Sequence, residues 1–153
     1  MSTSEIERLF DKWCKKLRIT PTWTVKLEIL DDPQGRKTGD IKIDCDDRKA
    51  IVLLNVSGAS SDNIEAVLVH ELFHLKLYPL DQTTETLIEA NFEEGSAGYN
   101  FAYTTFMLTL EQTVEELAKC FLLEFGENKE ENFGRCQRKK SFSELYSGLK
   151  SLE

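Results

Sequence analysis

One stretch of the sequence constrains the fold more than any other. Residues 66–77 read AVLVHELFHLKL, and His70, Glu71 and His74 interrupt an otherwise apolar run. The apolar positions recur at helical spacing from about residue 62, and Pro79 is expected to end this helix near residue 77. Burying two imidazoles and a carboxylate without partners would be costly. Two histidines on a helix can be ordinary polar residues, but this cost favours a site that uses the three side chains together.

The three residues form the pattern HExxH. On a helix, residues i and i+4 lie about one turn apart, so the rings of His70 and His74 project from one face and can reach one zinc ion. Glu71 lies beside such an ion, where it can take a proton from a water molecule that the zinc activates and pass it to a leaving amine. Both histidines of the chain are in this motif. The sequence therefore predicts a zinc site.

A catalytic zinc usually has three protein ligands and a water. With no third histidine, the remaining ligand must be a carboxylate or a thiolate, or be absent. A helix predicted from Thr109 to about Phe125, with Gly126 as its stop, carries Glu115 at the edge of its apolar face and Glu116 nearly opposite. Glu115 is therefore the preferred third ligand, and the small Ala118 lets two helices approach closely there.

Other carboxylates stay open as third ligands. Glu111 also points toward the core, but it lies in the first turn of the predicted helix, where the helix dipole alone accounts for a carboxylate. Glu89 is the other main alternative. The remaining candidates are charged residues of the kind that most often simply face solvent: Asp81, Glu85 and Glu93.

The rest of the chain predicts an α+β domain. Helical periodicity covers residues 4–18, with a cap at Ser2, Thr3 or Ser4. Period-two or continuous apolar runs predict strands at 22–30, 40–44 and 50–56, arranged as an antiparallel meander. After the helix at 62–77, another is expected at 83–91, residues 93–107 are hard to assign, and the tail 127–153 adds a short helix at about 142–149.

Composition narrows the classes of function. The formal charge is −8, which argues against general binding to nucleic acids or anionic membranes. The four cysteines form no CxxC pair, the first residues lack the apolar run of a signal peptide, and no apolar stretch is long enough to span a bilayer. We expect one domain over residues 1–153, in a reduced, cytoplasmic setting, with no membrane association.

The sequence has HExxH and, about 40 residues later, the pattern ExxA at Glu115-Glu116-Leu117-Ala118. This combination resembles the gluzincin-type zinc metallopeptidases, above all small single-domain members such as the minigluzincins and compact metallopeptidase-like proteins of bacteria and phages. The resemblance implies a zincin-like fold and peptide-bond hydrolysis, with Zn²⁺ held by His70, His74 and Glu115 and with Glu71 as general base. It also implies that the strand at 50–56 borders the cleft and pairs with an extended substrate. Lys119 stands where many gluzincins have an acidic residue.

Several expectations about activity follow. Tyr99 and Tyr103 are candidates to stabilise an oxyanion, although aromatic residues in such a segment more often pack. The first functional hypothesis is a selective zinc metallopeptidase that acts on a peptide or protein substrate, and the intact Glu71 favours it. The alternatives are a catalytically weak or inactive zincin-like regulatory or binding protein of a mobile element or stress response, and a scaffold with structural zinc. The oligomeric state is left open.

Overall fold

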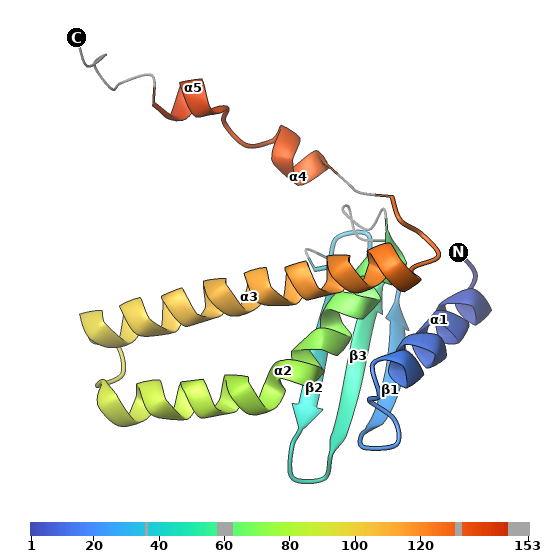
Figure 1. The fold of residues 1–153 in the computed structure, drawn as a ribbon, viewed down its shortest axis with the longest axis horizontal. Coiled ribbons are helices and arrows are strands. Elements are labelled where there is room, and N and C mark those ends of the chain that lie inside the picture. Colours follow the sequence, from blue (N-terminus) through green and yellow to red (C-terminus); the bar gives the residue numbers. More distant parts are fainter. Residues whose placement is uncertain (36, 58–62, 131–132, 147–153) are drawn as a thin grey trace.

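The computed structural model describes residues 1–35, 37–57, 63–130 and 133–146. It confirms the α+β class (Figure 1). The elements, in chain order, are α1 (Thr3–Lys16), β1 (Thr24–Leu30), β2 (Gly39–Asp44), β3 (Lys49–Asn55), α2 (Ile64–Asn91), α3 (Ala97–Phe125), α4 (Gly134–Gln137) and α5 (Phe142–Leu145). No helix within these ranges is both long and apolar enough to cross a membrane.

The three strands form one mixed sheet in the order β1-β3-β2. β1 runs parallel to β3, with Thr24 opposite Lys49, and β2 runs antiparallel to β3, with Gly39 opposite Leu54. The predicted antiparallel meander is therefore wrong. Alternation of apolar residues predicts that a segment is a strand, but not which strand it pairs with. β3 is the most buried of the three strands and takes the centre of the sheet.

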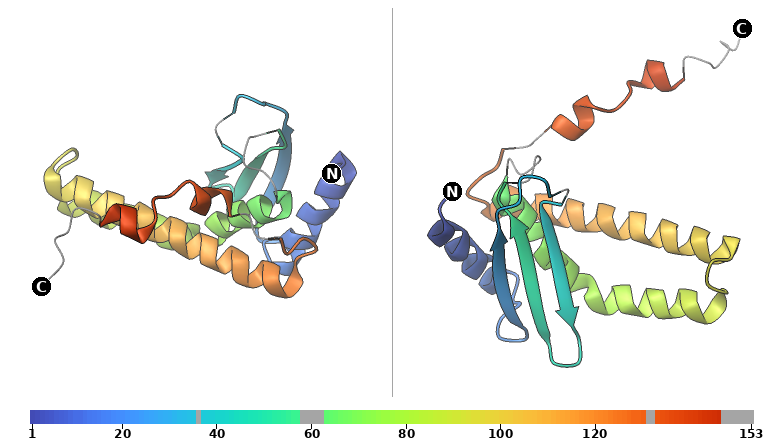
Figure 2. Two further views of the ribbon diagram at one scale, coloured as in Figure 1. Left: turned by 90° about the horizontal axis from the view of Figure 1, so that it is seen from above. Right: turned by 180° about the vertical axis from the view of Figure 1, so that it is seen from behind.

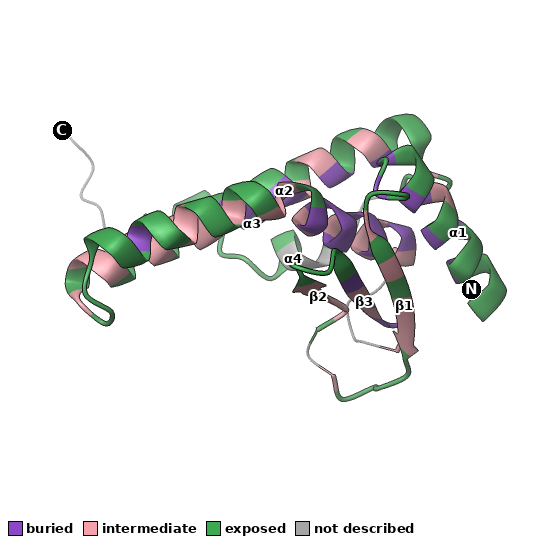
Figure 3. Ribbon diagram, turned by 90° about the horizontal axis from the view of Figure 1, so that it is seen from below, coloured by how far each residue is buried: buried purple, intermediate pink, exposed green. Residues whose placement is uncertain are grey.

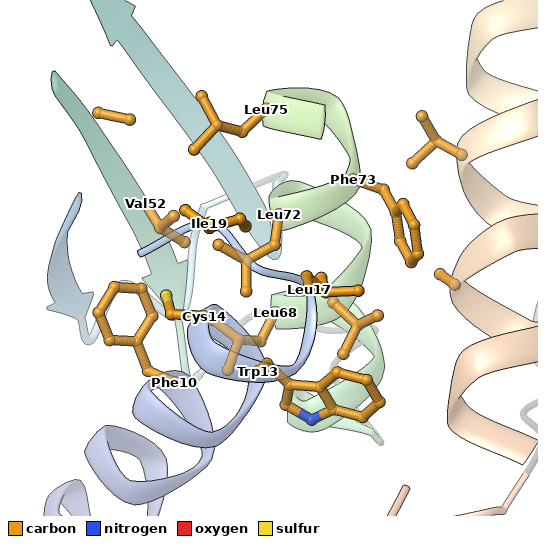
Figure 4. Packing of buried hydrophobic residues seen from close by; sticks show 14 of the residues in the cluster. Phe10, Trp13, Cys14, Leu17, Ile19, Val52, Leu68, Leu72, Phe73 and Leu75 are labelled. Atoms are coloured by element: carbon orange, nitrogen blue, oxygen red, sulfur yellow. The ribbon is translucent and has the colours of Figure 1, made fainter. Parts of the chain in front are cut away.

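The core lies between this sheet, the helices α1 and α2, and the second half of α3. Figure 4 shows Trp13 of α1, Leu68 and Leu72 of α2 and Val52 of β3 in one apolar cluster, and all four are almost completely buried. α1 begins as expected, because Ser2 caps it and forms a reciprocal capping box with Glu5. Burying one face of α2 against the core fixes which face carries the histidines.

One buried carboxylate joins the ends of several elements. Glu65, in the first turn of α2, has no exposed side-chain surface. It accepts hydrogen bonds from the indole Nε1 of Trp13 (2.7 Å), the Nζ of Lys12 (3.0 Å) and the backbone N–H groups of Glu127 (2.8 Å) and Asn128 (2.9 Å). The start of α2 is thereby tied to α1 and to the segment that follows α3.

α2 is longer than the sequence predicts. It continues through Pro79 to Asn91, where we expected a break near residue 77 and a separate helix at 83–91. A proline inside a helix removes one backbone hydrogen bond and usually kinks the helix without having to end it. Figure 1 shows α2 changing direction as it leaves the sheet. Packing along α3 supports the second half of α2.

α3 also begins earlier than predicted. Ser96 is its N-cap and accepts a hydrogen bond from the N–H of Tyr99 (3.1 Å), so the expected start at Thr109 is wrong. The segment before Thr109 contains glycine, aromatic residues and threonine, which hide the helical period. α2 and α3 lie side by side and extend beyond the sheet (Figures 1 and 2). Of the predicted short helix at 142–149, α5 covers Phe142–Leu145, and the part from residue 147 lies outside the described residues.

Candidate metal centre

The two histidines of the motif lie on the same face of α2, one turn apart. Their Nε2 atoms are 3.2 Å from each other, and each side chain is about one-fifth exposed. Either ring can be the donor of the hydrogen bond between them, depending on its tautomer, and two imidazole nitrogens this close together can also bind one cation. The rings are packed edge to face, with centroids 5.0 Å apart.

Glu111 of α3 completes this cluster. One carboxylate oxygen lies 3.5 Å from the Nε2 of His70, and the other lies 3.4 Å from the Nε2 of His74. One ligand atom from each of the three residues lies within 4.8 Å of the others, which is a geometry that can hold a metal ion. Two imidazole nitrogens and one carboxylate form a common donor set for catalytic zinc. Glu111 is half exposed, so the site is open to solvent on one side.

Glu115 contacts a different atom of the histidine pair. Its carboxylate lies 3.2 Å from the Nδ1 of His70, on the side of the ring away from Nε2, and it also pairs with Lys119 at 3.1 Å. The hydrogen bond to His70 is the main reason why the pKa of Glu115 falls to about 2. A carboxylate that accepts from Nδ1–H fixes the imidazole tautomer and leaves Nε2 free to bind a metal.

The charge around His70 favours its protonated form when no metal is present. Burial by itself lowers the pKa of His70, but the hydrogen bond to Glu115 and the charges of Glu71 and Glu111 outweigh it, so the pKa is raised. For His74, burial dominates and the pKa is lowered. The carboxylates around His70 thus offset the effect of burial on that ring, whereas burial decides the direction of the shift for His74.

The sequence favours Glu115 as the third ligand and keeps Glu111 as an alternative, whereas in the structure Glu111 lies near both Nε2 atoms and Glu115 near the Nδ1 of His70. The sequence places Glu111 in a first turn, but α3 begins at Ala97, so Glu111 lies in the middle of the helix. Glu111 and Glu115 are one turn apart, as His70 and His74 are. This matched i, i+4 spacing on two helices is the signal in the sequence that could have identified the pair.

Glu71 lies beside the cluster, beneath the sheet edge. It is buried, and this burial raises the pKa of its carboxyl to about 7, with Asp40 and Glu111 adding to the effect. A group with such a pKa can accept and release a proton near neutral pH. Gly39 of β2 makes room for it, because a Cβ at that position would lie 2.6 Å from the Oε1 of Glu71. Sequence reasoning did not identify Gly39.

The two tyrosines do not join the histidines. Tyr99 and Tyr103 stack with ring centroids 5.8 Å apart, and the hydroxyl of Tyr103 donates to Glu85 of α2 at 3.3 Å. Tyr103 lies eight residues before Glu111, about 12 Å along the helix. Glu89 lies further out on α2, is exposed and is not among the residues that converge on the site. The contacts of Tyr99 and Tyr103 therefore indicate a packing role, and neither tyrosine lies at the histidine pair.

The strand expected to border the cleft also changes. β3 corresponds to the predicted strand at 50–56, but it pairs with β1 on one side and with β2 on the other. Its backbone groups are used by both neighbours, so it cannot receive another strand. β2 is the edge strand next to Glu71.

Comparison of the chain with models of protein families, with curated proteins and with solved structures finds no match.

Proposed function

We propose that the protein is a zinc-dependent peptidase of zincin type. The observation that carries this proposal is the convergence of His70 Nε2, His74 Nε2 and the Glu111 carboxylate beside the buried Glu71. A site that only held zinc for structural reasons would have no use for the additional carboxylate, and structural zinc usually has four protein ligands. Three ligands and an open side leave a position for water and substrate.

Zn²⁺ bound there would supply a Lewis acid that activates water near neutral pH and polarises a carbonyl group. Glu71 would accept the proton of the attacking water and deliver it to the leaving amine. Glu115 would hold His70 through Nδ1, and Glu111 would act as the third ligand. The proton transfer by Glu71 accounts for an expected factor of about 10²–10⁴ in rate.

An extended peptide is the substrate that fits the surroundings of the site. β2 is an edge strand of the sheet, and in the described part of the chain no strand pairs with its outer side, where a further strand can be added. Because Gly39 of β2 contacts Glu71, a peptide paired with β2 would pass close to Glu71 and the histidine pair. We therefore propose strand addition at Gly39–Asp44, in place of the strand at 50–56.

The test is cleavage of a peptide library by zinc-loaded protein, read by mass spectrometry. We expect Glu71→Gln to retain zinc and to lose cleavage by at least about 10²-fold, because Gln cannot accept the proton. Glu116→Gln is the matched control, since Glu116 is exposed on the other side of α3. Cleavage by Glu71→Gln at the rate of the unchanged protein would refute the mechanism. Zinc binding without cleavage of any peptide would favour a binding protein.

A further inference from the structure

The parts of α2 and α3 that extend beyond the sheet, residues 77–108, form a two-helix unit that we call the arm. Several of its large apolar side chains are exposed to solvent. Within the arm only Ile88 is buried, and Figure 3 shows the rest as exposed or half-buried. Phe101 is 74% exposed, and Leu108 lies two turns further along the same face of α3. The other exposed large apolar residues of the arm are Leu80, Leu87 and Phe92. Apolar surface of this kind on a protruding element is typical of an interaction site.

The charge of the arm indicates the kind of partner it can bind. Between residues 77 and 108 the chain has five acidic residues and no lysine or arginine. Two such arms repel each other, so direct pairing between arms is disfavoured. A partner must combine apolar side chains with positive charge.

Residues 133–146, the part of the C-terminal region that contains α4 and α5, have these properties. From here on, the tail means residues 133–146 only. It carries four basic residues and one acidic residue. Phe142 is 77% exposed, and its ring lies 4.4 Å from that of Tyr146. Phe133 and Leu145 are exposed as well. In the described part of the chain, α4 and α5 contact no other helix or strand.

The tail does not reach its own arm in this structure. Asn128, just before the tail, is held at the start of α2 by Glu65 and by the side chain of Asn63, which donates to its carbonyl at 3.1 Å. Phe101 lies 24 residues before the end of α3 at Phe125, which is about 36 Å along the helix. Figure 1 shows the tail rising away from α3.

We propose that the tail of one copy docks on the arm of a second copy, in a reciprocal exchange that forms a two-fold symmetric dimer. Both copies then cover their exposed Phe101 and Phe142 with a single type of contact, and each acidic arm receives a basic tail. An exchange of this kind closes on itself and needs no third copy. The proposal does not depend on the metal centre.

The test is sedimentation velocity of the full chain from low to high micromolar concentration. We expect a dimer whose dissociation constant rises with salt, because opposite charges meet in the contact. Phe101→Asp on the arm and Phe142→Asp on the tail should each weaken the dimer by at least about 30-fold, as expected of contact residues at the centre of an interface. Leu123→Asp is the matched control, because Leu123 is equally exposed on α3 but outside the arm.

Two further measurements separate the exchange from other arrangements. Mixing the Phe101→Asp and Phe142→Asp proteins should restore dimers, since each mixed pair retains one intact arm and one intact tail that can meet. A photoreactive phenylalanine analogue at position 142 should cross-link to the arm of the other chain, which mixed ¹⁵N-labelled and unlabelled protein reveals by mass spectrometry.

Three outcomes would overturn the proposal. The first is a monomer at every concentration. The second is cross-links from position 142 to the arm that join only chains of the same label, which would mean that the tail docks on its own arm. The third is a dimer that survives Phe142→Asp but not Phe101→Asp, which would mean that arm pairs with arm.

Discussion

At the scale of single residues, Glu111 and Glu115 meet different atoms of the histidine pair. Glu111 faces both Nε2 atoms, whereas Glu115 faces the Nδ1 of His70. We therefore predict that Glu115→Gln weakens zinc binding by about 10–100-fold, as loss of a supporting carboxylate does, and that Glu111→Gln weakens it more, because a ligand is lost. Competition with a chelator of known affinity measures both. The reverse order would restore Glu115 as the ligand.

The sequence predicts His70, Glu71 and His74 as site residues because they lie within about one turn of one helix, where local geometry alone sets their positions. The rank of Glu111 among the candidate ligands depended on where α3 begins. With a start at Thr109 it is a first-turn residue that the helix dipole explains, and with a start at Ala97 that explanation no longer applies. The predicted start of α3 therefore decided which of the two glutamates the sequence favoured as the third ligand.

At the scale of elements, the close approach of β2 to α2 positions the proposed base. A Cβ at Gly39 would lie 2.6 Å from both Glu71 Oε1 and Val67 Cγ1, so Gly39→Ala must displace the strand or the carboxylate. We predict that Gly39→Ala retains zinc and lowers the cleavage rate by about 10–100-fold, since small misplacements of a reacting group are costly. Zinc content and cleavage rate are measured on the same preparation.

Two variants make this prediction specific. Adding Val67→Ala to Gly39→Ala should recover part of the rate, because it removes one of the two close contacts. Gly98→Ala is the control, since a Cβ there meets only the ring of Phe92, which is partly exposed and can turn. An unchanged rate in Gly39→Ala would show that the contact does not position Glu71.

Glu65 joins α2 to α1 and to the segment after α3, so its replacement should lower the free energy of unfolding. Burial raises the pKa of Glu65, but the hydrogen bonds from Asn128, Trp13, Lys12 and Glu127 together lower it below its ordinary value of 4.5. Its stabilising effect is therefore complete above about pH 4.5 and is lost as the pH falls through the lower pKa of the folded protein. We predict that Glu65→Gln costs about 2–3 kcal/mol at pH 7.

Urea unfolding at pH 7 and at pH 3 measures this effect. The difference between Glu65→Gln and the unchanged protein should be smaller at pH 3 than at pH 7, because below about pH 4.5 the unfolded chain takes up a proton at Glu65. Glu127→Gln is the control, because Glu127 is an exposed partner of Arg8 and should matter much less. A difference that is equal at both pH values would show that the charge of Glu65 does not contribute.

Local sequence is sufficient to predict some of the helices and strands, but not how they pair. The strand at Thr24–Leu30 and the helix at Thr3–Lys16 follow from their periodicity and capping residues. The order β1-β3-β2 could not be predicted, since it depends on contacts distant in the sequence. The end of α2 and the start of α3 were predicted wrongly at Pro79 and Thr109, because packing between α2 and α3 overrides the local propensity of these segments.

At the scale of the whole molecule, the sheet, α1, the first half of α2 and the second half of α3 form a body that buries the core, and the arm extends from it. The candidate metal centre lies where α2 and α3 leave this body. The residues proposed as its ligands come from two helices that meet only after folding, so they converge only in the folded chain. A metal that binds it should accordingly stabilise the fold.

The central claim is that His70, His74 and Glu111 hold one zinc ion. The most direct test is the metal content of protein purified without chelator or immobilised nickel, followed by titration of zinc into stripped protein. We predict one tightly bound zinc per chain in the unchanged protein and weak binding in Glu111→Gln. Absence of measurable zinc affinity in the unchanged protein would contradict the account.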